Sequence, residues 1–495
     1  QDSRLNNFNE EDWHIDKLSK PVLPVRCFNT VGCGCGPSCL ESCMLSLLNK
    51  LLIQPSLKKS LRQMELAEKE GTVPTILCNQ EAREDMATRV NNLLNDIRAS
   101  RSMNCMSKIM NCAGIMNCLN THLGLLKLGM KQGVASEKVN EPVFIVSFPR
   151  TATTILHRTM AHDRERFRNF DLCDMVSPIP PVRRDDVEGR QALANKVQTE
   201  MLDEMNGIFP GYMECLETMH GFRVAEAEED LGWYDTGLGH MYMDFLMLLH
   251  PEFRSKPGGM SPLESKECAK YRYAWLDMVM RIYQYNDKEG LDDKASKKGY
   301  GSMDDVESGN RATTDDSRPW LMKDPNHAAY LPELMEQFPD AKLIFTHRSP
   351  AEIVPSMAKL FVCFASVQHI PGSPGTTSEE WGKEAVLRME HYCQGLVDFA
   401  KDNQGKPYGL GVDPTRRIDF QFLDLAKDVP GAIRKIYSSF YPGTPGPSST
   451  AEAAFQTYLE ENERHKRGNQ RRSLEDFHLS EDDVAFSDYC NMFLS

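Results

Sequence analysis

The sequence lacks the features that would point to a membrane span or to nucleic acid. No stretch reaches the ~18 consecutive apolar residues that a span needs, and the first residues, QDSRLNNFNEEDW, are too polar for a signal peptide. Lysine and arginine number 57 against 71 aspartates and glutamates, which gives a net charge of -14. Without a broad basic surface, a nucleic-acid partner is not expected. We predict a protein without a transmembrane span, with peripheral membrane contact through N-terminal helices as an alternative.

Signals of a glycosylating, oxidising compartment are also missing. The sequence has no N-x-[ST] sequon, and a chain of 495 residues can build a core without disulfide staples. We therefore expect a cytoplasmic or other reducing compartment. The alternative is the Golgi lumen after removal of an anchor.

Four of the fifteen cysteines gather near the N-terminus, in VGCGCGPSCLESC. The spacing C-x-C-x₃-C-x₃-C of Cys33, Cys35, Cys39 and Cys43 is not that of ordinary zinc or iron–sulfur sites. Cys39 and Cys43 fall on an apolar helical stripe, which favours thiols buried in a core. A metal site and lipidation that tethers the protein to a membrane are the two alternatives.

Residues 1–135 have the pattern of an all-helical, Cys- and Met-rich extension. In SCLESCMLSLLNKLLIQP the apolar residues share one helical face, Ser38 and Glu41 form a capping box, and Gln54-Pro55 is expected to end the helix. Residues 82–130 continue the helical pattern and include the run MNCMSKIMNCAGIMNCLN. We predict that this extension precedes a second domain over residues 136–495.

From residue 141 the pattern changes to short apolar strands separated by long helices. Strands are expected in PVFIVSF (142–148), WLMKDP (320–325), AKLIFTHR (341–348) and RRIDFQF (416–422). The helices are expected at 153–163, 190–206, 262–285, 328–337, 350–362, 379–402 and 425–440. This alternation predicts an α/β fold with a parallel sheet covered on both faces, whose ligands bind at the carboxyl ends of the strands. The polar residues 286–318 are predicted to be a flexible surface insertion without chemistry.

The stretch FIVSFPRTATTILHR (144–158) predicts a strand, a loop and a helix. Residues 147–154 have the length of a phosphate-binding P-loop, G-x-x-x-x-G-K-[ST], but Thr153 replaces the lysine, and Ser147 and Ala152 replace the glycines. Backbone N–H groups and the positive end of the helix dipole suit an anion here, and Arg150 adds a permanent charge. The missing lysine disfavours a kinase or NTPase. A phosphate or sulfate bound without a metal is the better hypothesis.

Three motifs in this part of the chain resemble those of the PAPS-dependent sulfotransferase family. FPRTATT (148–154), LMKDPNH (321–327) and HRSPAEIVPS (347–356) follow the order and separation of the family's F-P-R-T-G-T-T, L-K-x-P-x-H and H-R-D-P-x-x-V-V-P-S. The resemblance covers residues 140–495, including RRSLEDFHLSEDDVAFSDY near the C-terminus. It implies a P-loop-like three-layer α/β fold with a central parallel sheet, and PAPS (3′-phosphoadenosine 5′-phosphosulfate) as co-substrate without a metal.

The resemblance also implies which residues contact the donor. The loop for the 5′-phosphosulfate falls on Arg150, Thr151, Ala152, Thr153 and Thr154. The site for the 3′-phosphate falls on Arg348 and Ser356. Arg348 ends a predicted strand and Ser356 lies in the following helix, so that a guanidinium fork and a hydroxyl can meet at one phosphate.

The transfer itself needs positioned reactants, stabilised charge and a base for the acceptor hydroxyl, because the transition state is loose and in line. The resemblance assigns Lys323 to the transferring sulfonate, and Arg150 is expected to hold the leaving group. AEAEEDLGW (225–233) resembles an acidic segment that lies beside the acceptor in the family. As general base we prefer Glu229, and then in this order Glu228, His327 and His220. Burial near the donor is expected to raise the pKa of the glutamate.

Two departures from the family motifs support a second hypothesis. Ala152 stands where the family has a glycine, and its Cβ narrows the approach to the donor if φ is positive there. Ser349 replaces the aspartate of H-R-D-P. These changes keep a non-catalytic nucleotide-binding or scaffold protein as the alternative, ahead of a kinase or NTPase. The acceptor is left as a hydroxyl of a small molecule, a lipid or a glycan, because variable loops line such pockets.

Overall fold

A parallel sheet of four strands forms the centre of the computed structural model, which describes residues 37–209, 211–237, 266–291, 318–366, 377–462 and 472–494. The strands are β1 (Val143–Ser147), β2 (Leu321–Lys323), β3 (Lys342–His347) and β4 (Arg417–Gln421). Their order is β2-β1-β3-β4, and Ile145 pairs with Lys323 on one side and with Ile344 on the other. All four predicted strands are confirmed. The carboxyl ends of β1, β2 and β3 meet at one edge of the sheet.

Helices cover both faces of this sheet, because alternate strand residues enter different hydrophobic clusters. Phe144 and Val146 belong to one cluster, and Val143 and Ile145 belong to the other. The cluster of Val143 and Ile145 is closed by α8 (Thr153–Ala161), α20 (Val429–Phe440) and α21 (Ser449–Glu461). The cluster of Phe144 and Val146 is closed by α15 (Lys266–Glu289), α16 (Leu331–Gln337), α17 (Pro350–Ala365) and α18 (Ser378–Asp402). The predicted three-layer α/β fold is therefore confirmed.

Shorter helices fill the connections and the C-terminal part. They are α9 (Leu172–Val176), α10 (Val187–Val197), α11 (Glu204–Ile208), α12 (Tyr212–Met219), α13 (Gly232–Thr236), α19 (Phe422–Lys427) and α22 (Ser487–Phe493). A π-helical turn, Gln198–Asp203, joins α10 to α11. Together these three segments account for the helix predicted at 190–206.

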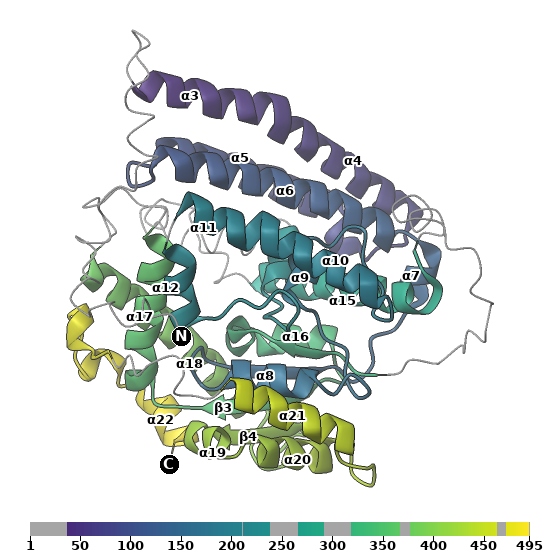
Figure 1. Ribbon diagram of the computed structural model, residues 1–495, viewed down its shortest axis with the longest axis vertical. Helices are drawn as coiled ribbons and strands as arrows, with labels where there is room; N and C mark the ends of the chain where they lie inside the picture. The colour runs from purple at the N-terminus through teal and green to yellow at the C-terminus, as the bar shows by residue number, and fades with distance from the viewer. Residues whose placement is uncertain are drawn as a thin grey trace.

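The residues before β1 form helices, as predicted, and these lie at the end of the molecule opposite α20 and α21 (Figure 1). They are α3 (Pro37–Leu48), α4 (Gln54–Glu70), α5 (Gln80–Ala99), α6 (Cys105–Gly129) and α7 (Gln132–Ser136). Leu57, Leu93 and Leu119 from three of these helices share the cluster of Phe144. The N-terminal helices are therefore continuous with the core of the α/β layers. None of the described helices combines the length and apolar character that crossing a bilayer requires.

The expected end of the first helix at Pro55 is wrong. A π-helical turn, Asn49–Ile53, carries the chain from α3 into α4, and Pro55 lies in the first turn of α4. A proline is tolerated there because its missing N–H falls among groups that need no partner within the helix.

The expected buried face of this helix is also wrong in part. Leu45 is buried, but Leu47 and Leu51 are each 58% exposed and Cys43 is exposed. The reason is that α3 is an outer helix, so only one of its sides packs on its neighbours. Cys33 and Cys35 lie outside the described residues. Contact with a membrane through the exposed leucines stays a prediction.

The described cysteines are not all in the same state. Cys363 in α17 is disulfide-bonded, whereas Cys78 and Cys112 in the N-terminal layer are free and buried. The compartment stays a prediction.

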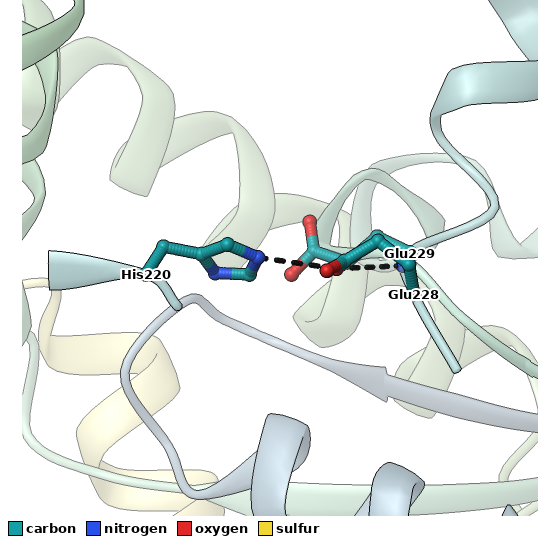
Figure 2. A group of neighbouring side chains, drawn as sticks. All are labelled: His220, Glu228 and Glu229. Atoms are coloured by element: carbon teal, nitrogen blue, oxygen red, sulfur yellow. Dashed lines mark hydrogen bonds and ion pairs between the residues drawn. The ribbon is translucent and has the colours of Figure 1, made fainter. Parts of the chain in front are cut away.

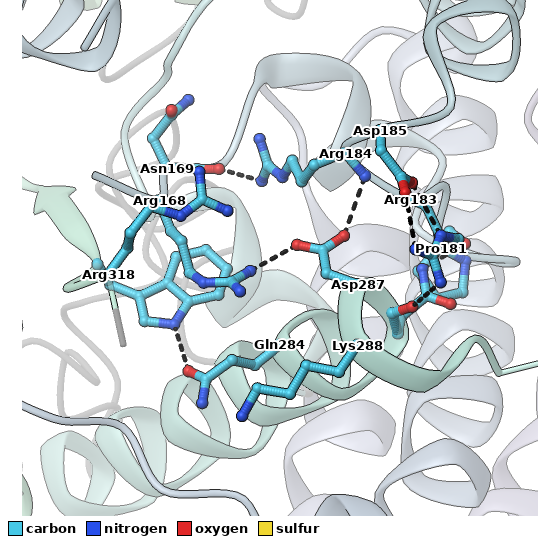
Figure 3. Close-up of polar contacts among 12 residues, drawn as sticks. Arg168, Asn169, Pro181, Arg183, Arg184, Asp185, Gln284, Asp287, Lys288 and Arg318 are labelled. Atoms are coloured by element: carbon cyan, nitrogen blue, oxygen red, sulfur yellow. Dashed lines mark hydrogen bonds and ion pairs between the residues drawn. The ribbon is translucent and has the colours of Figure 1, made fainter. Parts of the chain in front are cut away.

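The predicted polar insertion begins too early, because the helix α15 continues through its first residues. Asp287 accepts hydrogen bonds from Arg168 Nη1 at 2.5 Å and from the backbone N–H of Arg184 at 2.9 Å (Figure 3). Asn286 donates from Nδ2 to the carbonyl oxygen of Pro181 at 3.1 Å. These polar groups are buried by partners that the sequence pattern did not reveal. Residues 292–317 of the expected insertion lie outside the described residues.

A buried histidine joins α6 to α15 and predicts a specific acid sensitivity. His122 stacks on Trp275 with ring centroids 4.8 Å apart and an angle of 8° between the rings. Both side chains are fully buried, and the two ring nitrogens of His122 have no hydrogen-bond partner. Burial therefore lowers the pKa of His122 to about 3. The imidazole stays neutral in the folded protein over the range in which it becomes charged in the unfolded chain.

Replacing His122 with phenylalanine should make the protein less sensitive to acid. The unfolded chain takes up a proton near pH 6.5 and the folded protein does not, so the wild type loses stability as the pH falls below that value. At pH 5 this loss is about 2 kcal/mol. We expect the drop in the free energy of unfolding between pH 8 and pH 5 to be smaller by that amount in His122→Phe. Denaturant unfolding at both pH values measures it, and equal drops would contradict the assignment.

Candidate active site

The loop between β1 and α8 is held in shape by hydroxyl groups at its base. Ser147 Oγ and Thr151 Oγ1 lie 2.5 Å apart, and Thr346 Oγ1 donates to Thr151 Oγ1 at 2.8 Å. Thr151 Oγ1 also donates to the carbonyl oxygen of Phe148 at 2.6 Å. The side chain of Thr151 is fully buried. Its hydroxyl therefore stabilises the loop, and the expectation that it contacts the donor holds at most for its backbone.

The same loop presents the N-terminus of α8 to a cleft of about 1790 Å³. Arg150 and Ala152 have left-handed backbone angles, with φ of 69° and 64°. Ala152 is the N-cap residue, and no side chain caps the first turn of α8. Uncapped N–H groups at a helix N-terminus attract an anion. Thr153 and Thr154 line the cleft beside them.

The left-handed conformation of Ala152 predicts a gain in stability on substitution by glycine. This conformation costs a residue with a Cβ about 1–2 kcal/mol, and part of that gain is offset by the freedom that glycine has in the unfolded chain. We expect Ala152→Gly to raise the free energy of unfolding by about 1 kcal/mol, as measured by denaturant titration. Ala161→Gly, at the last residue of α8 and with a right-handed helical backbone, is the control and should lower it. A loss of stability in both variants would contradict the prediction.

Arg150 and Arg348, which the sequence places 198 residues apart, lie in the same cleft. Arg348 donates from Nη1 to the carbonyl oxygen of Arg150 at 2.7 Å, and from Nε to Glu352 at 2.7 Å. Its guanidinium lies 4.1 Å from the ring centroid of Phe422. Ser356 lines the cleft as well. The two arginines that were assigned to opposite ends of one nucleotide are thus brought together by the end of β3 and the loop after β1.

Several further cations line this cleft that the sequence motifs did not assign to the donor, among them Lys427 and Arg472. Lys427 follows β4 in α19, and Arg472 comes from the C-terminal part of the chain. Their signal in the sequence was position. Lys427 lies six residues after the last strand, and Arg472 is the second residue of the C-terminal motif.

Lys323 and Glu229 meet at the carboxyl end of β2. Lys323 is almost fully buried, forms an ion pair with Glu229, and donates from Nζ to Thr154 Oγ1 at 3.2 Å. The acidic segment is fixed there by backbone bonds, since Asp230 N–H donates to the carbonyl of Lys323 at 3.1 Å and Lys323 N–H donates to Asp230 Oδ1 at 2.9 Å. Glu229 is half-buried and lines the cleft. An amine, a hydroxyl and a carboxylate therefore converge beside the loop.

Glu228 lines the same cleft but is buried, and it is held by several donors. Arg158 donates from Nη2 to Oε2 at 2.8 Å, and His220 Nε2 lies 3.1 Å from Oε1 (Figure 2). The backbone N–H of Glu229 donates to the same Oε1 at 2.9 Å. Burial alone would raise the pKa of Glu228, but His220, Arg158 and Lys323 together hold it well below its usual range. The expected rise in pKa is wrong for this glutamate, which is a fixed anion and a poor base.

His327, the third candidate base, lies behind the cleft. Its ring is fully buried, with Nδ1 3.1 Å from the hydroxyl of Tyr273 and Nε2 3.2 Å from Asp230 Oδ2. It packs edge-on against Phe144, 5.1 Å between ring centroids. It does not line the cleft, whereas His220 does. Position alone thus removes His327 from contact with an acceptor, although its motif is intact.

Two groups of side chains in the described part of the chain have the composition of a metal site. His220, Glu228 and Glu229 form one, and a fully buried set, Asp230, Asp324 and His327, forms the other, each with ligand atoms within 4.8 Å of one another. In the first group Arg158 and Lys323 already compensate the carboxylates. In the second, burial and the neighbouring negative charges of Asp230 and Glu229 raise the pKa of Asp324 to about 7. In both groups the carboxylates have partners within the protein, and the expectation of a reaction without a metal stays a prediction.

A sequence model of the sulfotransferase family matches residues 142–441, which contain the loop, Lys323 and Arg348. The chain belongs to the sulfotransferase family. The enzyme is similar in structure to sulfotransferase STF9 from Mycobacterium avium, with a TM-score of 0.60 at 16% identity over 87% of this chain and 96% of that one. It is also similar to sulfotransferase STF1 from Mycobacterium tuberculosis H37Rv, with a TM-score of 0.56 at 18% identity over 86% and 97%. At these identities the likeness shows the fold alone. Among curated proteins, none matches the sequence.

Sequence reasoning missed one structural residue of this sulfotransferase, Arg158. It is buried in α8, where it pairs with Glu226 at 3.2 Å and with Glu228. It also donates from Nε to the carbonyl of Ala227 at 3.1 Å. Arg158 follows Thr154 by one helical turn, and this i, i+4 spacing on an apolar helix was the available signal.

The N-terminal helix α6 also takes part in the cleft. Met110, Asn117 and Cys118 of this helix line it. The cleft of this sulfotransferase is therefore built partly from residues that precede the matched family region.

Proposed function

We propose that this sulfotransferase moves the sulfonate group of PAPS to a hydroxyl of a small-molecule, lipid or glycan acceptor, with Glu229 as general base. One observation carries the proposal. Arg150, Arg348 and Lys323 lie at or just after the carboxyl ends of three different strands and line one cleft. A nucleotide with phosphate groups at the 5′ and 3′ positions of its ribose needs a cation at each of these positions.

The residues present fit this donor. The uncapped first turn of α8 and Arg150 would hold the 5′-phosphosulfate, and Arg348 with Ser356 would hold the 3′-phosphate. When bound, PAPS supplies a sulfonate that is already activated by its bond to phosphate. Ala152 departs from this fit, because its left-handed backbone meets the condition under which its Cβ narrows the approach to the donor.

In the proposed reaction the chain positions groups and moves one proton. The acceptor oxygen bonds to sulfur while the bond from sulfur to the bridging oxygen breaks, so that the sulfated acceptor and 3′-phosphoadenosine 5′-phosphate (PAP) are formed. Glu229 takes the hydroxyl proton, and Lys323 stabilises the sulfonate oxygens when it leaves its ion pair with Glu229. Glu228, fixed by Arg158, keeps His220 in place beside them.

Titration of the full-length protein with PAP, and separately with ATP plus magnesium, tests the proposal. Binding of PAP, together with transfer of labelled sulfonate from PAPS to a mixed panel of alcohols, phenols, sterols and sugars, supports it. Binding of PAP without any transfer supports the non-catalytic alternative. Tighter binding of ATP with magnesium than of PAP supports a kinase or NTPase. Either of the last two results overturns the proposal.

A further inference from the structure

The part of the cleft formed by residues 201–219 is apolar throughout. Eight residues of this stretch line the cleft, and each is methionine, leucine, phenylalanine or tyrosine. The acidic residues Asp203, Glu204, Glu214 and Glu217 of this stretch do not line it, and the first three are exposed. The polar and apolar sides of α11 and α12 are therefore separated, and the apolar side faces the cleft.

This apolar wall is fixed in place and leads directly to the proposed reaction centre. Leu216 of α12 is buried against Cys363 of α17, with Met213 and Phe364 packed around them. At its other end α12 stops at Met219, whose carbonyl oxygen accepts a hydrogen bond from Arg150 Nη1 at 2.6 Å. The next residue is His220, which contacts Glu228. A molecule whose hydroxyl lies near Glu229 thus has about 12 Å of apolar helix beside it.

The wall is also rich in the side chain that adapts best to an apolar partner. Met201, Met205 and Met213 are half-buried and line the cleft. Methionine fills irregular apolar spaces because its side chain is unbranched and polarisable. A sugar would require hydrogen-bond partners for each hydroxyl, and residues 201–219 offer the cleft one phenol, that of Tyr212.

We infer that the acceptor is an alcohol carried on a large apolar body, either an aliphatic chain or a fused-ring sterol. This inference rests on the proposed function. The hydroxyl oxygen forms its bond to sulfur at Glu229 and Lys323, its proton passes to Glu229, and PAP leaves with the electrons of the broken sulfur–oxygen bond. The apolar body lies along α11 and α12.

Binding of alcohols in the absence of donor tests the inference. The full-length protein is titrated with butan-1-ol, hexan-1-ol, octan-1-ol and decan-1-ol, with cholesterol in cyclodextrin, and with glucose. The dissociation constant should fall roughly fourfold for each added methylene group if the chain is buried. We call the rise in affinity along the four alkanols the ladder. A steep ladder assigns an aliphatic chain to the acceptor, and cholesterol bound more tightly than decan-1-ol assigns a sterol. Equal binding of all four alkanols without binding of cholesterol, or glucose bound best, overturns the inference.

Two substitutions in the wall give a matched comparison. Met205→Gln combined with Met213→Gln keeps the side-chain length and should at least halve the slope of the ladder or the affinity for cholesterol. Leu387→Gln, at a side chain of α18 that is 57% exposed, is the control and should leave both unchanged. Retained binding of PAP shows that a variant is folded. A protein that binds PAP and transfers sulfonate but has a flat ladder and no affinity for cholesterol contradicts this inference alone, whereas a steep ladder without PAP binding contradicts only the proposed function.

Discussion

Arg348→Ala is expected to weaken PAP binding by about 100- to 1000-fold and to abolish the preference of the enzyme for PAP over AMP. Two charge-assisted hydrogen bonds to the 3′-phosphate are worth about 3–4 kcal/mol, and AMP lacks that phosphate. Calorimetric titration with both nucleotides gives the ratio of the two affinities. In the wild type this ratio should be large, and in the variant it should be close to one.

The ratio separates a direct contact from an indirect effect. Arg348 also donates to the carbonyl oxygen of Arg150. Its loss therefore alters the loop and lowers the affinity for both nucleotides together. Only a contact with the 3′-phosphate removes the difference between them. Arg434→Ala is the control, because this arginine of α20 forms only an exposed ion pair with Glu452. A preference for PAP that survives in Arg348→Ala would show that another cation, such as Arg472, holds the phosphate.

Glu229→Gln is expected to lower the rate of sulfonate transfer by about 10²- to 10⁴-fold, the usual contribution of a general base. Glutamine keeps the shape of the side chain but does not accept the proton. PAP binding should change little, since Glu229 pairs with Lys323 and is proposed to contact the acceptor and not the phosphates. Single-turnover transfer from labelled PAPS measures the rate, and titration with PAP measures the binding.

The neighbouring residues provide the comparison for this experiment. His220→Gln removes one partner of Glu228 and should lower the rate by less than Glu229→Gln does. Glu228→Gln should act mainly on stability, because it leaves the buried Arg158 with one ion pair fewer. If Glu229→Gln retains the rate and His220→Gln loses it, His220 is the base and the assignment of Glu229 is wrong.

The sequence predicted the sheet well because each strand carries its own signal. The four strands are short apolar runs between turn residues and long helices. Such runs are typical of strands in a parallel sheet that is buried on both faces. The three motifs at the strand ends then placed Arg150, Lys323 and Arg348 at one edge. The roles of these residues remain predictions.

The errors arose where a partner distant in the sequence decides the outcome. Pro55 lies in the first turn of α4, where its missing N–H is tolerated, and Leu47 is exposed because α3 is covered on one side only. Asp287 belongs to a polar run of the sequence, but it lies in α15 and pairs with Arg168. Glu228 and Glu229 are adjacent and chemically identical, yet Glu228 pairs with Arg158 and Glu229 pairs with Lys323. No local pattern distinguishes these cases.

The contribution of α6 to the cleft has a consequence for how the walls of the cleft can vary. One side of α6 belongs to the hydrophobic cluster of the sheet, whereas Met110 and Cys118 line the cleft. We expect substitutions limited to these two side chains to change the shape of the cleft while Arg150, Lys323 and Arg348 stay in place. The core then keeps the fold as the cleft wall varies.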